Sequence, residues 1–255
     1  MPLVKPKKNL GQHFLRNEDI ARRIVESIAT TPKNVLEIGP GMGVLTKYLI
    51  SHHYSNFKVV EIDHESVAYL EQHYPDLQGN ILSQDFLALD LDTFFSNNLT
   101  IIGNFPYNIS SQILFKVLDY KHLVNEVVGM FQKEVAERVA AAPGKKQYGI
   151  LSVLLQAFYD IEYLFTVDEQ QFFPPPQVKS AVIRLIKNPE KQLHCSEVLF
   201  KQVVKAAFNQ RRKTLRNSLN QFQFAADYKQ NPIFIKRPEQ MSVQEFEEIC
   251  ANIIL

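Results

Sequence analysis

A chain of 255 residues with 45% apolar and 22% charged side chains can hold one full α/β core and a small second domain, and this composition argues against disorder. The sequence has no apolar stretch long enough to cross a bilayer and no signal-peptide core, so we expect a cytoplasmic protein without a membrane partner. The formal net charge of +1 excludes a uniformly basic nucleic-acid binder.

Helical and strand-like patterns alternate through most of the chain. Asn17 is an expected N-cap, followed by an apolar stripe of Ile20, Ile24 and Ile28 at helical spacing. Further on, we predict strands over 35–38, 58–62, 80–83, 100–102 and 126–130, and helices over 44–51, 65–73, 110–118 and 133–141. This alternation predicts a mostly parallel, doubly wound sheet.

The pattern changes near residue 188. Apolar runs over 161–167 and 178–186, joined through Pro174-Pro175-Pro176, are expected to close the sheet with an antiparallel edge. From Asn188-Pro189 onward the patterns are helical, first over 196–208 and then in a basic stretch. We therefore predict an α/β catalytic domain over residues 1–187 and a small all-helical domain over residues 188–255.

Basic residues are concentrated in two segments that contain no acid, the N-terminal arm and the stretch from Lys201 to Arg216. Taken alone, such a run is as often a solvated helix face as a nucleic-acid contact. Cys195 and Cys250 lie far apart in the sequence, with neither metal-ligand spacing nor a disulfide framework. We therefore expect a reducing compartment and no metal site.

A glycine-rich turn follows the first predicted strand, in Glu37-Ile38-Gly39-Pro40-Gly41-Met42-Gly43. Alternate glycines allow a sharp turn and let a ligand lie against the backbone, so Gly39 and Gly41 are expected contacts. A dinucleotide fingerprint would need its third glycine at position 44, which is Val44. The spacing favours S-adenosylmethionine, which carries no pyrophosphate.

Two acidic residues follow at the ends of the next two predicted strands. Glu61 lies about twenty residues beyond the loop, where a carboxylate can accept both ribose hydroxyls of the cofactor. Asp85 is placed to accept a hydrogen bond from the cofactor's adenine amine. We include the neighbours Ile62 and Phe86 in this site, because ligands of open α/β sheets bind at the carboxyl ends of the strands. Singly, each acid also fits a helix cap or a solvated side chain.

The fourth strand of the predicted parallel set runs into Gly103-Asn104-Phe105-Pro106-Tyr107-Asn108. The exocyclic amine of adenine is a poor nucleophile, because its lone pair is delocalised into the ring. Two acceptors, the Asn104 side chain and a backbone carbonyl near Phe105 or Pro106, can take its hydrogens and aim the lone pair at a sulfonium methyl group. Tyr107 offers a face for the flipped base, and Phe172 is an expected second aromatic wall.

In these motifs the chain resembles the small-subunit ribosomal RNA adenine dimethyltransferases, the KsgA/RsmA family, across nearly its whole length. The resemblance rests on segments in a fixed order: 8–15 (KNLGQHFL), 37–46, 103–110, Gln132-Lys133-Glu134, 172–182 with its Pro-Pro-Pro and Ser-Ala-Val, and 208–217 (FNQRRKTLRN). It implies a Rossmann-like S-adenosylmethionine methyltransferase that converts two neighbouring adenosines, in a hairpin near the 3′ end of 16S rRNA, to dimethyladenosines during small-subunit assembly.

Carried over residue by residue, the resemblance places further residues in the cofactor site and assigns the basic segments to RNA. His13 and Leu15 join Gly39, Glu61, Asp85 and Asn104 around the cofactor. With RNA as the implied partner, the basic residues expected to contact it are Lys7, Lys8, Arg211, Arg212, Lys213 and Arg216. We expect a monomer that binds the small ribosomal subunit.

Two positions depart from the family's usual pattern. His13 stands where Asn is usual, and its ring can still donate or accept a hydrogen bond. Phe105 stands where Leu is usual, and we expect it to contribute chiefly its backbone. Two alternatives stay open: a large-subunit rRNA adenine methyltransferase, from which 208–217 separates this chain, and an assembly factor whose methylation is secondary.

Overall fold

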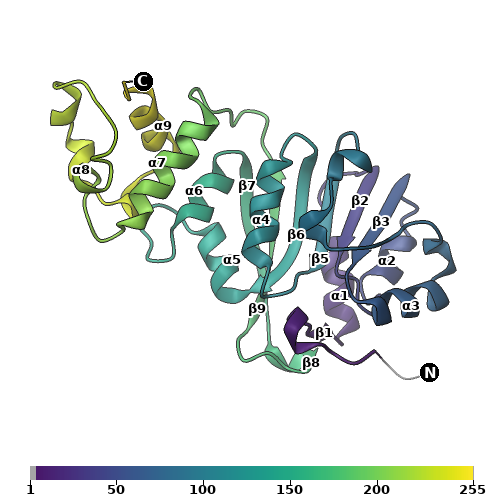
Figure 1. Cartoon of the computed structure of the whole chain (residues 1–255). Helices are drawn as coiled ribbons and strands as arrows, with labels where there is room; N and C mark the ends of the chain where they lie inside the picture. The colour runs from purple at the N-terminus through teal and green to yellow at the C-terminus, as the bar shows by residue number, and fades with distance from the viewer. Residues whose placement is uncertain (1–3, 255) are drawn as a thin grey trace. The chain divides into compact units, whose positions relative to one another are not determined.

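The computed structural model describes residues 4–254, and the largest element within this range is a seven-stranded sheet (Figure 1). The strand order is β4-β3-β2-β5-β6-β9-β7. The bounds are β2 (Asn34–Ile38), β3 (Asn56–Glu61), β4 (Ile81–Ser83), β5 (Leu99–Asn104), β6 (Val124–Gln132), β7 (Tyr159–Val167) and β9 (Ser180–Lys187). Strands β2 to β6 pair in parallel, and β9 pairs antiparallel with β6, so the predicted parallel sheet with an antiparallel edge is confirmed.

Five α-helices alternate with these strands: α1 (Glu18–Glu26), α2 (Thr46–Ile50), α3 (His64–His73), α4 (Ser110–Asp119) and α5 (Lys133–Ala140). The side chain of Asn17 caps α1 by accepting from the N–H of Ile20 at 3.1 Å, as predicted. Helix α1 ends at Glu26, before Ile28, and α2 begins only at Thr46 because the glycine-rich turn occupies the preceding residues. Helices α1 and α2 share one core with β2, β5, β6 and β9, while α4 lies in front of the sheet in Figure 1.

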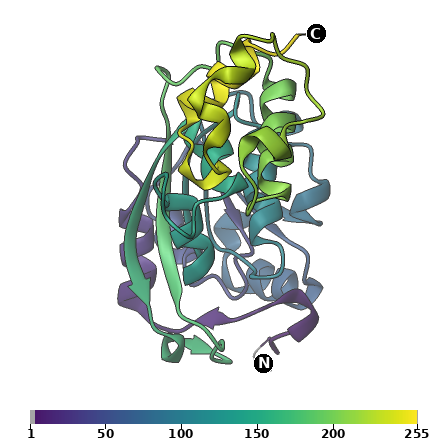
Figure 2. The ribbon, with the colours of Figure 1, turned by 90° about the vertical axis from the view of Figure 1, so that its left-hand side faces the viewer.

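A second, two-stranded sheet was not predicted from the sequence. It joins β1 (Phe14–Leu15) antiparallel to β8 (Phe172–Phe173), so that the N-terminal segment lies beside the loop between β7 and β9 (Figure 2). The register pairs Phe14 with Phe173 and Leu15 with Phe172. Leu15 and Phe172 are buried, whereas Phe173 is 54% exposed. Each strand has two residues, which are too few to show the alternation of apolar and polar side chains that predicts a strand.

The chain divides into two compact units, 1–136 with 161–187, and 137–160 with 188–255. The predicted boundary after Lys187 is one of the division points, but residues 137–160, which we had placed in the first domain, group with the second unit. The α-helices of the second unit beyond α5 are α6 (Ile150–Gln156), α7 (Glu197–Asn209), α8 (Leu215–Ser218) and α9 (Val243–Ala251). Helix α6 packs on α7 and α9, which explains its grouping.

In the described residues of the second unit, all regular structure is helical except the first two residues of β7 and one isolated bridge, Phe224 to Ile253. The rings of Tyr148, Phe208 and Phe246 pack against one another in tilted pairs, with centroids 6.3 and 6.1 Å apart. The basic stretch is not one helix, because α7 ends at Asn209 and residues 210–213 form a turn before α8. Short 3₁₀ helices lie in both units: η1 (Lys8–Leu10), η2 (Pro75–Leu77), η3 (Phe86–Ala88), η4 (Leu91–Thr93), η5 (Glu169–Gln171), η6 (Tyr228–Gln230), η7 (Pro232–Ile235) and η8 (Pro238–Gln240).

Residues 4–254 contain neither a membrane-spanning helix nor a cluster of metal ligands. Within this range, no helix combines the length and apolar character needed to span a bilayer. Nor do three or more His, Cys, Asp or Glu side chains in the same range gather as ligands for a metal ion.

Candidate active site

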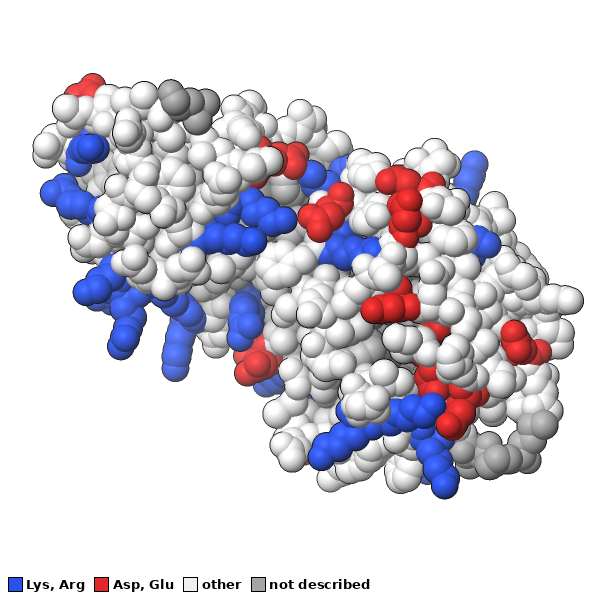
Figure 3. Space-filling view, in the orientation of Figure 1, with Lys and Arg blue, Asp and Glu red and all other residues white. Residues whose placement is uncertain are grey.

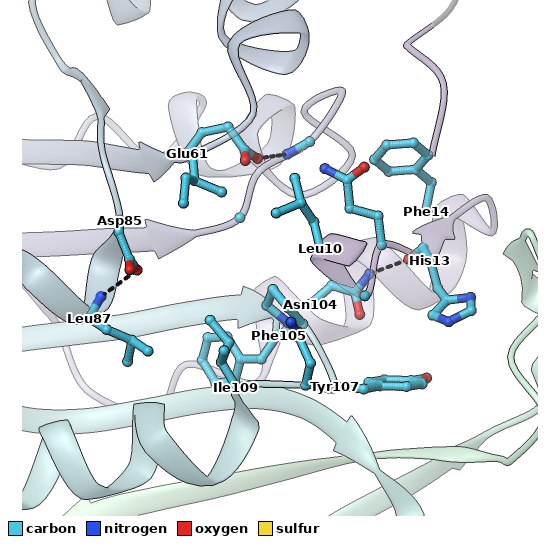
Figure 4. Close-up of a pocket in the computed structure, with 17 residues that line it drawn as sticks. Leu10, His13, Phe14, Glu61, Asp85, Leu87, Asn104, Phe105, Tyr107 and Ile109 are labelled. Atoms are coloured by element: carbon cyan, nitrogen blue, oxygen red, sulfur yellow. Dashed lines mark hydrogen bonds between the residues drawn. The ribbon is translucent and has the colours of Figure 1, made fainter. Parts of the chain in front are cut away.

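A cavity of about 200 Å³, partly open to solvent, lies at the carboxyl ends of the parallel strands (Figure 4). Parallel strands end at one edge of the sheet, so the side chains that follow them converge there. The cavity is lined by Leu10, Gly11, Gln12, His13, Phe14, Gly39, Gly41, Glu61, Ile62, Asp85, Leu87, Asn104, Phe105, Pro106, Tyr107, Asn108 and Ile109. Most of the predicted cofactor and catalytic residues are therefore brought together.

The glycine turn and Glu61 form one hydrogen-bonded unit. Gly39 and Gly41 have φ of 65° and 56°, a region that favours glycine. The N–H of Gly41 donates to Glu61 Oε2 at 3.1 Å, and the N–H of Asp63 donates to Oε1 at 2.9 Å (Figure 4). Burial raises the pKa of Glu61, which is 5% exposed, although these two donors oppose the shift. The Glu61 carboxylate is thus held in place from two sides.

Glu37 is a second buried acid, which the sequence analysis did not assign to the site. Its Oε2 accepts from the hydroxyl of Thr46 at 2.7 Å, and burial raises its pKa to about 8. It lines a neighbouring hollow together with Phe14, Gly39 and Asn104. The only feature of the sequence that could have pointed to Glu37 is its place at the start of the glycine-rich turn.

Asp85 follows the third strand and lines the cavity, as predicted. Of Ile62 and Phe86, the two apolar residues also predicted for this site, only Ile62 lines the cavity. Asp85 is exposed, caps η3 by accepting from the N–H of Leu87 at 2.9 Å, and lines the cavity. Ile62 is 47% exposed there, as a residue that contacts a ligand would be. Phe86 is buried in the core and does not line the cavity; Leu87 takes its place.

The N-terminal segment covers one side of the cavity and is fastened by Asp63. Lys7 Nζ lies 2.5 Å from Asp63 Oδ1, and Gln12 Nε2 donates to Oδ2 at 3.2 Å. The N–H of Lys7 also donates to Gln12 Oε1 at 2.8 Å. Burial works to raise the pKa of Asp63, but the bonds from Lys7, Gln12 and Ser66 outweigh it and hold this pKa below its ordinary value. The side chain of Lys7, which was predicted to bind RNA, therefore forms an ion pair with Asp63 of the same chain.

His13 links this segment to the catalytic loop. Its carbonyl accepts from Asn104 Nδ2 at 2.8 Å, and its Nδ1 lies 2.7 Å from the carbonyl oxygen of Pro174. Its ring also packs on Tyr107, with centroids 5.2 Å apart. Leu15, by contrast, is buried beneath the segment and lines only the neighbouring hollow.

Asn104 stands at the end of β5 with its amide orientation fixed. The bond from Nδ2 to the His13 carbonyl decides which end of the amide is which (Figure 4). No residue among 4–254 donates to Oδ1 of Asn104. One hydrogen-bond acceptor is therefore left available at the cavity.

Phe105, expected to contribute chiefly its backbone to the loop, turns its side chain into the core. Its ring is 1% exposed and meets Phe131 edge-on, with centroids 4.9 Å apart. Gly103 and Gly129 leave the space for it, since a Cβ on Gly129 would lie 2.3 Å from the Phe105 ring. The ring fills the core below the loop.

Tyr107 is held in place by a hydrogen bond between its hydroxyl and that of Ser180, a residue that the sequence analysis did not assign to the site.

The structure contradicts the expected second aromatic wall from Phe172. Its side chain is 3% exposed and belongs to the core cluster that contains Leu15 and Val182. Successive side chains of a strand point to opposite faces, so burial of Phe172 turns Phe173 outward. The sequence alone did not reveal which of the two adjacent phenylalanines is buried.

Comparisons with known proteins agree with this geometry. The family model described as "Ribosomal RNA adenine dimethylase" matches residues 4–254. This chain belongs to that family. Among its relatives are two proteins named ribosomal RNA small subunit methyltransferase A. That of Parabacteroides distasonis is 59% identical over 252 residues, covering 98% of this chain and 94% of the relative, and that of Cytophaga hutchinsonii is 57% identical over 251 residues, covering 98% and 97%.

Solved structures show the same fold. A dimethyladenosine transferase from Plasmodium falciparum superposes with a TM-score of 0.78 at 23% identity, over 95% of this chain and all of the other. The 23S rRNA methyltransferase ErmE gives 0.71 at 24% identity, over 94% of this chain and all of its own. The dimethylase family member described here thus has the Rossmann-like fold of S-adenosylmethionine methyltransferases.

The basic residues of this dimethylase lie partly free and partly engaged. Arg212, Lys213 and Arg216 are exposed, as is Lys8 in the N-terminal segment. Arg211 is half-buried, donates to the carbonyl of Lys146 and lies 4.0 Å from Glu239. Lys and Arg side chains gather along one edge of the second unit, below α7 and α8 in the view of Figure 3.

Proposed function

We propose that this protein transfers methyl groups from S-adenosylmethionine to the N6 amines of two adjacent adenosines in a hairpin near the 3′ end of 16S rRNA, during small-subunit biogenesis. Membership of the dimethylase family and the names of relatives at 59% and 57% identity support the substrate. The single observation that supports the chemistry is the fixed Asn104 amide, whose free Oδ1 faces the same cavity as Glu61.

The residues at this edge fit the cofactor. The Glu61 carboxylate, held by Gly41 and Asp63, would accept both ribose hydroxyls, and the exposed Ile62 offers an apolar face to the adenine. Asp85 would accept from the adenine amine through the oxygen that does not cap η3. Gly39 has open space before it, since a Cβ there would meet only Pro106 at 3.8 Å. Bound here, the cofactor supplies a methyl group activated by its sulfonium charge.

The catalytic loop would orient the target amine. Asn104 Oδ1 accepts one N–H of the amine, and we infer that the Phe105 carbonyl accepts the other, because the Pro106 carbonyl already accepts from the N–H of Ile109 at 3.3 Å. Tyr107, fixed by Ser180, provides the stacking face. The amine then presents its lone pair without prior deprotonation, since its proton becomes acidic only as the new bond forms.

RNA binding in this proposal rests on Lys8, Arg212, Lys213 and Arg216, with Arg211 bracing the turn that carries them. We further propose that the protein acts as a cytoplasmic monomer without a metal ion. Size-exclusion chromatography with light scattering tests the monomer directly.

A substitution at Asn104 tests the chemistry. Asn104→Ala should lower methyl transfer about 100-fold or more, because the amine loses its alignment, while binding of the subunit stays nearly intact. The assay uses radiolabelled S-adenosylmethionine, small subunits that lack the modification, and mapping of the labelled nucleosides. The matched control is Asn125→Ala. Asn125 lies near the start of β6, at the edge of the sheet opposite to Asn104, and its side-chain amide donates to Asn98. Label in large-subunit RNA, or equal loss of binding and transfer in Asn104→Ala, contradicts the proposal.

The two alternatives are less well supported. The large-subunit methyltransferase ErmE shares only 24% identity, which reports the fold and not the substrate. A pure assembly factor has no need for the fixed Asn104 amide or the restrained Glu61 carboxylate.

A further inference from the structure

Phe173 is an unusually placed aromatic side chain. It is 54% exposed, and no other phenylalanine among residues 4–254 is as exposed. A single exposed apolar residue is ordinarily unremarkable, so its surroundings decide whether it has a role.

The surroundings of Phe173 are rigid and adjoin the active site. Its strand pairs with β1 so that Phe173 lies opposite Phe14, which lines the cavity. On one side, the N–H of Arg16 donates to the carbonyl of Gln171 at 2.8 Å. On the other, the carbonyl of Pro174 is held by His13, another cavity residue. The ring is therefore presented from a fixed backbone at the rim of the pocket.

A positive charge accompanies the ring. The guanidinium carbon of Arg16 lies 5.8 Å from the ring centroid of Phe173, within the range of a cation–π contact. Arg16 is exposed, and no carboxylate in the described part of the chain forms an ion pair with it. An open aromatic face beside an uncompensated guanidinium is the combination that binds an unpaired nucleotide, with the ring stacking on the base and the cation meeting the phosphate.

We propose that Phe173 and Arg16 form a platform for the nucleotide next to the adenine in the catalytic pocket. This inference rests on the proposed function. When one adenosine is flipped out, its neighbour loses a stacking partner, and the exposed ring beside the pocket replaces it. Phe172 cannot do this, because it is buried. The platform is a binding subsite for RNA and touches neither the methyl donor nor the amine that reacts.

The test measures KM for unmodified small subunits, KM for S-adenosylmethionine, and kcat. Phe173→Ala should raise KM for the subunit on the order of 10-fold, the loss expected for one stacked base, and leave KM for S-adenosylmethionine unchanged. Arg16→Gln should raise the same KM, and Arg16→Lys should raise it less. Tyr163→Ala is the matched control, since it removes an exposed aromatic whose hydroxyl contacts only Thr166.

A second pair of variants separates stacking from packing. Phe173→Tyr keeps an aromatic face and should match the wild type, whereas Phe173→Leu keeps apolar volume and should behave like Phe173→Ala. If Phe173→Leu is as active as Phe173→Tyr, or if Phe173→Ala leaves KM for the subunit unchanged, the platform is disproved. An inactive wild type would instead disprove the proposed function.

Discussion

Glu37 is a carboxyl group that folding places in an apolar environment beside the cofactor cavity. Its ordinary pKa is 4.5, and burial raises it to about 8, so at neutral pH the folded protein holds a proton that the unfolded chain has released. Stability that depends on this proton is fully present below pH 4.5 and is lost as the pH rises through about 8.

Glu37→Gln, which is neutral at every pH, should remove this loss. Between pH 5 and pH 8.5 the free energy of unfolding of the wild type should fall by roughly 4 kcal/mol relative to the variant. Denaturant unfolding at the two pH values, without cofactor, measures the difference. Glu71→Gln, an exposed residue of α3, serves as the control and should follow the wild type. Parallel pH curves for wild type and Glu37→Gln would show that Glu37 is ionised.

Phe105 depends on two glycines for its place in the core. Gly129→Ala puts a Cβ 2.3 Å from the Phe105 ring and 2.6 Å from that of Phe131, so it should cost about 1–3 kcal/mol by overpacking. Phe105→Leu in the Gly129→Ala background should recover part of this loss, because the smaller side chain leaves room. A double-mutant cycle on the free energy of unfolding measures the coupling. Additive effects would mean that the new methyl group is accommodated elsewhere.

At the scale of residues, the sequence was informative wherever a residue type has one chemical use. Glu61, Asp85 and Asn104 follow strand ends, and all three line the cavity. It was uninformative where burial decides between neighbours, as for Phe172 and Phe173. The side chain of Lys7 was likewise ambiguous, because only the fold brings Asp63 to it.

The N-terminal segment is a separate element that is fastened over the cavity by one carboxylate. Asp63 is completely buried at its side chain and receives bonds from Lys7, Gln12 and Ser66, while its own N–H orients Glu61. Ordering of the segment and shape of the ribose site are therefore coupled through this residue.

Asp63→Ala should loosen the segment and weaken cofactor binding. We expect Kd for S-adenosylmethionine to rise on the order of 10-fold, because hydrogen bonds to charged groups are lost. Trypsin should cut faster after Lys7 and Lys8. Calorimetry and timed proteolysis are the measurements, and Asp90→Ala, which removes a cap of η4 far from the segment, is the control. Unchanged Kd together with faster cutting would separate the segment from the cofactor.

Elements with a long enough period were predictable, and short ones were not. The helices over α1, α3, α4 and α7 and the strands of the large sheet appear within a few residues of the predicted bounds. β1 and β8 have two residues each, so their pairing depends on tertiary contact. Helix α6 is apolar except for Ser152 and Gln156, with Leu151, Val153 and Leu154 all buried, and so apolar a segment gives little amphipathic signal.

For the whole molecule, charge is divided between the two units. The second unit carries more Lys and Arg than Asp and Glu, and the first unit carries the reverse. The near-neutral total therefore conceals a basic surface, which suits an RNA partner bound through phosphates.

Neutralising Arg212, Lys213 and Arg216 together should weaken RNA binding and flatten its salt dependence. Each lost phosphate contact should reduce the slope of log K against log salt by about 0.7 to 0.9. Binding titrations at several salt concentrations measure this, with Lys33→Gln, an exposed base of the first unit, as the control. If the triple variant keeps the slope of the wild type, these bases form a solvated surface and nothing more.

The sequence predicts consecutive domains with a boundary after Lys187, whereas the compact units are interleaved. Nothing in the local pattern of 137–160 shows which unit will bury it, because burial of Tyr148 depends on Phe208, sixty or so residues later. Long-range packing of this kind is invisible to periodicity.

This interleaving fixes an order of events during synthesis. The sheet is complete once β9 has been synthesised. Helix α6 is synthesised before β9, but its apolar surface is covered only after α7 and α9 have been synthesised. The second unit is therefore completed after the sheet, and the nascent chain exposes the apolar surface of α6 until α7 and α9 have been synthesised.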